Sequence, residues 1–272
     1  MTAKIGFIGA GNMGGALLRS IAANGAPGKF QLLAYDIHTP LVDALSKEIG
    51  VLAVKSAAEL VSASDVVVLA VKPQYSESVL NEIKSTFLPG KVLVTIIVGV
   101  PISYYKNILG EEAKIVRTMP NTPALVGAGM TLVCADSSVS QEEKALVMEL
   151  MSCCGLAEEL EERLMNEVTA LTGSSPAYIY MLIEAMADAA VQSGLPRKLS
   201  YRLAAQAVMG SAKMVLETGT HPGELKDMVC SPAGTTIEAV AVLEKEGFRH
   251  SILAAMDACT QKAREIGRRF KS

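Results

Sequence analysis

The sequence has no apolar run long enough to cross a membrane. Its longest apolar stretch, residues 92–102, falls far short of the roughly 20 residues that span a bilayer, and it predicts a buried strand. The mean hydropathy of +0.33 therefore comes from Ala, Val, Leu and Met spread over helices. A surface this apolar is often hidden in an oligomer interface.

Neither sign of charge is in excess. The chain carries 25 basic and 28 acidic side chains, a formal charge of -3, which gives no reason to expect nucleic acid or an anionic membrane as a partner. Low-complexity stretches, repeats of solenoid length and flexible linkers are also missing. With 272 residues, 50% of them hydrophobic, the chain is long enough for one or two packed domains.

The cysteines follow no metal-binding or redox pattern. There are five of them, an odd number, and a disulfide between the neighbours Cys153 and Cys154 would be strained. We therefore expect free thiols in a reducing compartment, a cytoplasmic location and no metal site. Residues 1–4 lead directly into an apolar strand, so we expect no signal peptide and a chain start that is part of the fold.

Short apolar runs alternate with helical stretches up to about residue 151. Runs that are apolar on both faces and alternate with helices predict a parallel sheet covered on both sides, a Rossmann-like doubly wound α/β domain over residues 1–161. The expected strands are residues 4–8, 31–35, 66–71, 92–98, 114–119 and 130–134, and the expected helices are residues 13–24, 41–49 and 141–151.

The strand signal stops after about Glu161, and residues 162–272 are predicted to form an all-α domain. In residues 176–192 the polar side chains Glu184, Asp188 and Gln192 form one narrow stripe, so this helix should be buried on most sides. Helices this apolar predict that two chains interleave them in a dimer. The alternative is a helical cap that packs on the α/β domain of its own chain.

A glycine-rich turn follows the first predicted strand and precedes a helix. This context, with an acid about 20 residues further on, predicts a dinucleotide-binding loop, although a glycine-rich turn without a ligand is the alternative. Gly9 should permit the tight turn, Gly11 should let the backbone approach the pyrophosphate, and Gly14 should let helix and strand pack closely. The loop comprises Gly9, Ala10, Gly11, Asn12, Met13 and Gly14.

Asp36 ends the second predicted strand. An acid there hydrogen-bonds the ribose hydroxyls of NAD and repels the extra phosphate of NADP, so it favours NADH; the alternative is that Asp36 only caps the next helix. Ala70, Val71 and Lys72 follow a strand at the carboxyl edge and should run along the cofactor, unless Lys72 is an ordinary surface lysine.

Two segments of the helical half place Ser before Pro, at Ser175 and Ser231. We interpret each Ser as an N-cap and each Pro as the first helical residue, so each helix start offers unpaired amides to an anion; plain capping is the alternative. The second start adds the hydroxyls of Thr235 and Thr236. A third segment, residues 117–123, has two prolines that stiffen a turn at the sheet's carboxyl edge.

These segments together resemble the pyrroline-5-carboxylate reductase family, which carries out the last step of proline synthesis. The resemblance rests on the motifs at residues 70–73, 119–123, 173–178 and 227–237, of which the last is highly specific, and it covers the chain in order. It implies hydride transfer from NAD(P)H to the C=N carbon of 1-pyrroline-5-carboxylate, giving L-proline, in a homo-oligomer built from dimers through the C-terminal helices.

The resemblance also implies roles for single residues. Thr236 would contact the ring nitrogen, and Glu162 would lie near the amine of proline. The implied substrate-binding residues are Ser231, Ala233, Gly234, Thr235, Thr236 and Asn121. The implied cofactor contacts are Gly9, Ala10, Gly11, Asn12, Met13, Gly14, Asp36, Ala70, Val71, Lys72, Pro73 and Val98.

The chain departs from the family pattern at a few positions. It has Ser175 and Ala233 where the family usually has Gly, and a Cβ at these points restricts the backbone. Met228 replaces an Asn that touches the cofactor in some relatives. Many members carry Ser, Asn or Arg near the position of Asp36 and prefer NADPH, so the acid here supports NADH.

Two other functions fit part of the sequence. A β-hydroxyacid dehydrogenase shares the plan of a Rossmann domain followed by helices, but its catalytic Lys has no counterpart in residues 176–192. A dinucleotide sensor without catalysis would keep the glycine loop, since a fold alone does not assign a function.

Overall fold

The computed structural model of the chain describes residues 2–270. The described residues form two compact units. One comprises residues 2–174 together with residues 259–270, and the other comprises residues 175–258. Helix α11 (Phe248–Arg268) begins in the second unit and ends in the first.

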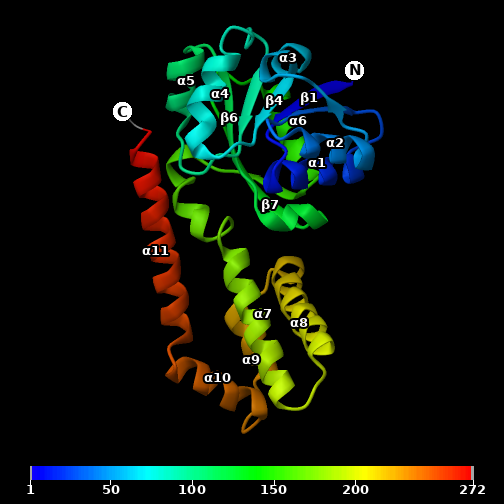
Figure 1. Ribbon diagram of the computed structural model, residues 1–272. Helices are drawn as coiled ribbons and strands as arrows, with labels where there is room; N and C mark the ends of the chain where they lie inside the picture. The colour runs from blue at the N-terminus through cyan, green and yellow to red at the C-terminus, as the bar shows by residue number, and fades with distance from the viewer. Residues whose placement is uncertain (1, 271–272) are drawn as a thin grey trace. The chain divides into compact units, whose positions relative to one another are not determined.

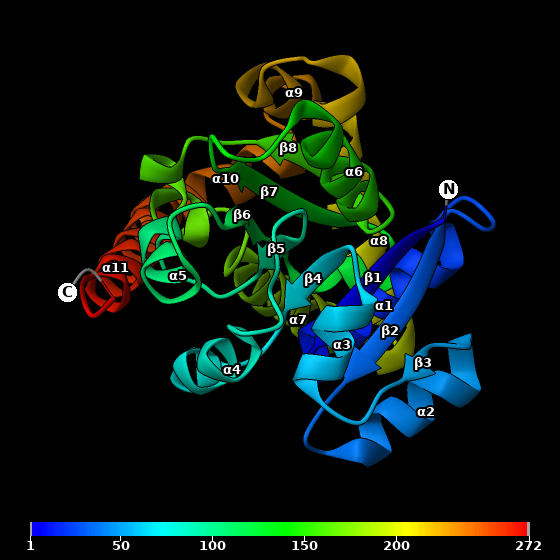
Figure 2. The same ribbon diagram turned by 90° about the horizontal axis from the view of Figure 1, so that it is seen from above.

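The first unit is built around an eight-stranded sheet in the order β3-β2-β1-β4-β5-β6-β7-β8. Neighbouring strands are parallel except β6 and β7, which are antiparallel. Figure 2 shows the central strands side by side in this order. The strands are β1 (Ala3–Ile8), β2 (Phe30–Tyr35), β3 (Leu52–Ala53), β4 (Val66–Leu69), β5 (Val92–Thr95), β6 (Lys114–Met119), β7 (Gly129–Ala135) and β8 (Gly155–Glu159).

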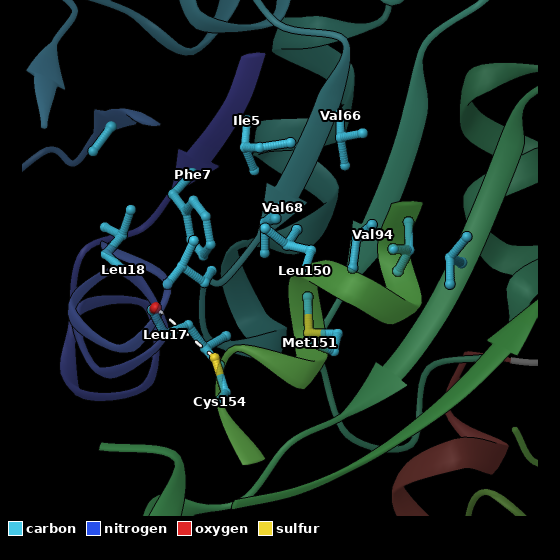
Figure 3. Packing of buried hydrophobic residues seen from close by; sticks show 14 of the residues in the cluster. Ile5, Phe7, Leu17, Leu18, Val66, Val68, Val94, Leu150, Met151 and Cys154 are labelled. Atoms are coloured by element: carbon cyan, nitrogen blue, oxygen red, sulfur yellow. Dashed lines mark hydrogen bonds between the residues drawn. The ribbon is translucent and has the colours of Figure 1, made fainter. Parts of the chain in front are cut away.

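Helices cover both faces of this sheet. Val66 and Val68 of β4 join one buried cluster, with Leu17 of α1 and Leu150 of α6 (Figure 3). Val67 points the other way, into a cluster with residues of α3, α4 and α5. The helices of this unit are α1 (Asn12–Asn24), α2 (Thr39–Ile49), α3 (Ala57–Ala63), α4 (Ser76–Ile83), α5 (Ile102–Leu109) and α6 (Gln141–Ser152), with short 3-10 turns η1 (Pro73–Tyr75), η2 (Thr122–Val126), η3 (Glu162–Leu164) and η4 (Glu167–Ala170).

The alternation of buried side chains explains why β4 has no polar residue. Because successive strand residues point to opposite faces and both faces are covered, every position must be apolar.

The predicted doubly wound α/β fold is confirmed. The strands β3 and β8 were not predicted, since β3 has two residues and three of the five residues of β8 are exposed.

The second unit is entirely helical. It contains α7 (Ser175–Gln192), α8 (Arg197–Thr218), α9 (Pro222–Val229), α10 (Thr235–Lys245) and the first half of α11. Helices α7 and α8 lie side by side (Figure 1). Ala187 is the only buried residue within α7, and Met181 is 68% exposed. The prediction that α7 is buried on most sides is therefore wrong for the chain by itself.

The helices and the cysteines bear on what the composition predicted. Over residues 2–270, every helix is too short or too polar to be a candidate membrane span. All five cysteines are free thiols, and Cys134 and Cys154 are buried. The Cys154 thiol lies 3.9 Å from the carbonyl oxygen of Leu17 in the core between α1 and α6 (Figure 3).

Candidate functional site

The glycine loop between β1 and α1 requires glycine at two positions for steric reasons. Gly9 has a φ of +105°, and a Cβ there would lie 2.6 Å from the Ala70 carbonyl oxygen. A Cβ on Gly14 would lie 2.2 Å from the Gly9 carbonyl oxygen. A Cβ on Gly11 would have no atom within 4 Å. Gly9 and Gly14 therefore shape the loop, whereas Gly11 leaves open space beside the backbone.

Helix α1 begins at this open space. Its N-cap is Gly11, which has no side chain to cap the helix, and its first turn contains no acid. The first amides of an α-helix have no acceptor within the helix, and the helix dipole places partial positive charge there. Such a start binds phosphate groups without any basic side chain.

Asp36 connects the end of β2 to the glycine loop. Its Oδ2 accepts a hydrogen bond from the Ala10 amide at 2.7 Å, and its Oδ1 accepts one from the His38 amide at 2.8 Å. The N-cap of α2 is His38, so Asp36 is not the capping residue. A carboxylate oxygen accepts more than one hydrogen bond, so Asp36 keeps the capacity to accept ribose hydroxyls.

Asp36 and the loop line one cavity of about 330 Å³. This cavity brings together six of the predicted cofactor contacts. They are Gly9, Gly11, Asp36, Ala70, Val71 and Lys72. Lys72 and Asp36 therefore lie in one cavity although 36 positions separate them in the sequence, because β1, β2 and β4 are neighbours in the sheet.

A second cavity of about 810 Å³ continues from the first and shares Gly11, Ala70, Val71 and Lys72 with it. Its lining adds four more of the predicted contacts, Asn12, Met13, Pro73 and Val98. Ala10 and Gly14 are buried and line neither cavity.

Much of the wall of this second cavity was not predicted from the sequence. The missed residues come from the ends of β5 and β6, from η4 and the turn that follows it, and from the last turns of α11. They are Ile96, Ile97, Met119, Pro120, Thr169, Gly173, Ser174, Cys259, Lys262, Ala263 and Ile266. Of these, Met119 and Pro120 belong to the turn that was expected at the carboxyl edge of the sheet. The helical periodicity of residues 251–268 carries no signal that their last turns rejoin the α/β unit.

The side chain of Asn121 forms hydrogen bonds within the first unit. It is 8% exposed. Its Nδ2 donates to the Thr172 carbonyl oxygen at 3.0 Å, and its Oδ1 accepts from the Met130 amide at 2.9 Å. These two bonds tie the loop after β6 to β7 and to the turn after η4.

Glu162 also has partners within the first unit. Its Oε1 accepts from the Ile102 amide at 2.7 Å and lies 3.4 Å from Nη1 of Arg117. Arg117 is 4% exposed, and its Nη2 donates to Oδ1 of Asn166 at 2.7 Å. Burial lowers the pKa of Arg117 while Glu162 opposes that shift. Glu162 and Arg117 line another cavity, of about 570 Å³, rather than the one beside the glycine loop.

The segment around Ser231 is a turn rather than the start of a helix, so that prediction is wrong. Helix α10 begins at Thr235, with Gly234 as its N-cap. The Gly234 amide donates to the Ser231 carbonyl oxygen at 3.0 Å, and Ala233 has a φ of +54°. A Pro in the second position and a positive φ in the third are typical of a type II turn, and a positive φ cannot belong to a helix.

This turn explains one departure from the family pattern. The third position of a type II turn favours Gly, which is what the family usually has at position 233. Among the described residues, Ala233 is the only non-glycine residue with a positive φ. Ser175 has no such strain, because it is the first residue of α7, with Pro176 in the second position.

Thr235 and Thr236 occupy the first turn of α10. Thr235 is exposed and Thr236 is half-buried. Their amides have no acceptor within the helix, so the second unit presents amide and hydroxyl donors at one helix start. This is the arrangement that holds a carboxylate.

Similarity to known proteins extends over almost the whole chain. The family model for pyrroline-5-carboxylate reductase dimerisation matches residues 162–266. The model described as NADP oxidoreductase, coenzyme F420-dependent, matches residues 4–99. The pyrroline-5-carboxylate reductase of Escherichia coli (strain K12) is 49% identical over 268 residues, which cover 98% of this chain and 100% of that protein.

Solved structures agree. The Plasmodium falciparum pyrroline carboxylate reductase with NADP bound is 36% identical, with a TM-score of 0.87 over 97% of this chain and 98% of the other. A pyrroline-5-carboxylate reductase from Coxiella burnetii is 34% identical, with a TM-score of 0.89 over 98% and 99% of the two chains. On sequence and fold together, the chain belongs to the pyrroline-5-carboxylate reductase family.

Proposed function

We propose that this chain reduces the C=N carbon of 1-pyrroline-5-carboxylate to give L-proline, with a reduced nicotinamide dinucleotide as the second substrate. The observation that carries this proposal is the pair of adjoining cavities at the glycine loop, of about 330 and 810 Å³, in a chain of this family. The open space beside Gly11 and the uncapped start of α1 fit a pyrophosphate.

Different residues along this cleft would bind different parts of the cofactor. The amides at the start of α1 hold the pyrophosphate, and Asp36 accepts from the ribose. The apolar wall at residues 96–98 and 119–120 faces the larger cavity, where water is excluded from a flat ring. When bound, the nicotinamide supplies the hydride. We propose the cofactor contacts Gly9, Ala10, Gly11, Asn12, Met13, Gly14, Asp36, Ala70, Val71, Lys72, Pro73 and Val98.

The substrate carboxylate is proposed to lie at the start of α10. Ala233, Gly234 and Thr235 would hold it through amides and a hydroxyl, and the Ser231 hydroxyl would support the turn. Thr236 would hydrogen-bond the ring nitrogen directly or through water. A hydroxyl is a weak acid, so we assign it an orienting role rather than proton donation.

Asn121 and Glu162 complete the proposed site. A C=N bond accepts hydride well only when its nitrogen is protonated, and the charge of Glu162 would favour that cation. Both assignments rest on the family resemblance. Within the chain, the Asn121 amide is engaged with Thr172 and Met130, and Glu162 with Ile102 and Arg117.

We infer a preference for NADH from Asp36. Its carboxylate lines the smaller cavity, and Lys72 is the only basic side chain in that lining, so the extra phosphate of NADPH would meet an acid with one compensating cation. The direct test is turnover of 1-pyrroline-5-carboxylate with each cofactor, followed by nicotinamide absorbance. No turnover with either cofactor would overturn the proposed function.

We further propose a cytoplasmic homo-oligomer built from dimers through the C-terminal helices, with the domain boundary after residue 161. Support for the oligomer comes from the dimerisation match over residues 162–266 and from the exposed apolar side chains of the second unit. The free thiols support a reducing compartment. Helix α7 contains no Lys, so the lysine-dependent chemistry of β-hydroxyacid dehydrogenases has no residue to perform it there.

A further inference from the structure

Three hydroxyl groups are buried together behind the wall of the larger cavity. They belong to Thr95, the last residue of β5, to Tyr105 of α5 and to Thr118 of β6. Thr95 and Tyr105 are 0% exposed and Thr118 is 2% exposed. Helix α5 packs against β6, and β6 pairs with β5 (Figure 2).

Hydrogen bonds join the three hydroxyls through Thr95. The Tyr105 Oη lies 2.7 Å from the Thr95 Oγ1, which also accepts from the Ile97 amide at 3.3 Å. The Thr118 hydroxyl donates to the Thr95 carbonyl oxygen at 3.0 Å. Burial raises the pKa of Tyr105 far above its ordinary value, so the phenol stays neutral and able to donate. Thr95 is thus held both by its side chain and by its backbone.

The residues directly after these hydroxyls form the cavity wall. Ile96, Ile97 and Val98 follow Thr95, and Met119 and Pro120 follow Thr118. The bond from the Ile97 amide to Thr95 fixes the turn by which the chain leaves β5. Met119 is held in addition from the other side, where the Thr169 hydroxyl lies 3.4 Å from its sulfur. Two neighbouring strand ends are therefore fixed to one buried group of hydroxyls.

The side chains of this wall carry no nitrogen or oxygen with which to orient a ring. They act on the ring's position by shape, so the accuracy of the wall depends on what lies behind it. We propose that the Tyr105 hydroxyl is a positioning group for hydride transfer, acting through Thr95, which Thr118 also holds, to fix the wall at residues 96–98 and 119–120. This inference rests on the proposed reductase function.

The test compares Tyr105→Phe with Tyr104→Phe, the same deletion one residue away. The Tyr104 hydroxyl lies outside this group of hydroxyls, 3.4 Å from the Ser76 hydroxyl. We expect Tyr105→Phe to lower kcat about tenfold, equivalent to about 1.4 kcal/mol in the barrier, while KM for the cofactor changes less than about twofold. The Tyr104→Phe variant should keep the wild-type kcat.

The kinetic isotope effect on kcat separates positioning from a general loss of structure. With cofactor deuterated at the transferred position, the isotope effect on kcat should rise in Tyr105→Phe, because hydride transfer becomes the slow step. A folded Tyr105→Phe variant with wild-type kcat and isotope effect overturns the proposal. An increase in KM for the cofactor without a change in kcat overturns it as well, because the wall would then serve binding alone.

A second pair of variants covers the case in which Tyr105→Phe does not fold. Thr118→Val removes the donor to the Thr95 carbonyl at nearly constant volume, and Thr118→Ser retains it. We expect a lowered kcat in the first variant and its restoration in the second, and equal kcat in both overturns the proposal. Wild-type protein without any turnover would instead overturn the proposed function, and cofactor binding followed by fluorescence would still report whether the cleft is intact.

Discussion

At the scale of single residues, the proposed preference for NADH rests on Asp36. Replacing Asp36 by Asn keeps an oxygen acceptor for the Ala10 or His38 amide and removes the charge. We expect the ratio of kcat/KM with NADH to that with NADPH to fall by about fivefold or more, because a like-charge contact of about 1 kcal/mol or more is removed. Steady-state kinetics with both cofactors measure the ratio.

The matched control for this substitution is Asp43→Asn, an equal loss of charge on the exposed face of α2. It should leave the cofactor ratio unchanged. If both variants shift the ratio equally, the preference depends on the total charge of the domain and Asp36 has no special role.

Ala233 carries the backbone strain of the turn before α10. The left-handed conformation at this position costs an L-residue about 1–2 kcal/mol, and Gly adopts it without that cost. Gly in turn adds a conformational entropy cost of about 0.5–1 kcal/mol. We expect a net gain of about 0.5–1 kcal/mol in the free energy of unfolding, measured by thermal or denaturant unfolding. A loss of stability would show that Ala233 makes contacts that offset its strain.

Thr236 is expected to act on the substrate and not on the cofactor. Thr236→Ala should lower kcat/KM for 1-pyrroline-5-carboxylate by about tenfold, the value of one hydrogen bond of about 1.4 kcal/mol. Thr236→Ser should recover most of it, and KM for the cofactor should stay constant in both variants. Equal kinetics for the Ala and Ser variants would remove Thr236 from the proposed site.

At the scale of elements, the glycine loop contains one glycine that packing requires and another that lies beside open space. A Cβ on Gly14 would meet the Gly9 carbonyl oxygen at 2.2 Å, and a Cβ on Gly11 would meet nothing within 4 Å. We therefore expect Gly14→Ala to destabilise the protein by about 1–3 kcal/mol and Gly11→Ala to keep its stability but weaken cofactor binding. Thermal unfolding and calorimetric titration of the cofactor distinguish the two effects, and equal losses of stability would contradict the assignment.

The same elements show how far the sequence could predict the structure. The apolar runs within β1, β4, β5 and β6 identified the parallel sheet, because burial on both faces leaves a pattern that needs no tertiary information. The turn at Ser231 was misread, since Ser-Pro is compatible both with a helix start and with a type II turn. The positive φ of Ala233 decides between them, and Ala gives no sign of it in the sequence.

That the glycine loop, Asp36 and the end of β4 share one cavity was largely predictable, and the rest of the cavity wall was not. Gly11, Asp36 and Val71 lie at fixed distances from strand ends, so their meeting follows from sheet order. Cys259, Lys262 and Ile266 line the same cleft because the chain returns after the whole second unit. Nothing in the periodicity of α11 reports such a return.

At the scale of the whole molecule, the second unit carries apolar surface that a lone chain would expose to water. Met181 on α7 is 68% exposed, and Leu88 in the first unit is 60% exposed. We expect Met181→Asp to dissociate the oligomer, because a charge would have to be buried in an apolar interface. Leu88→Asp, at a similarly exposed position outside the dimerisation match, should leave assembly intact. Light scattering coupled to gel filtration measures both masses.

Other masses for the two variants would point to a different contact between subunits. If neither variant changes the mass, Met181 lies outside the contact between subunits, and the remaining exposed apolar side chains of α8 and α10 become the surfaces to test. If both variants dissociate, the first unit takes part in assembly as well.

The return of α11 to the α/β unit also sets an order of events during synthesis. Domains generally fold as they emerge, from the N-terminal end onward, and the eight strands emerge from the ribosome well before residues 259–266. A nascent chain therefore has its glycine loop in place while one side of the dinucleotide cleft is still untranslated. Competence to bind a nicotinamide should appear late and abruptly, once the final helical turns have been translated.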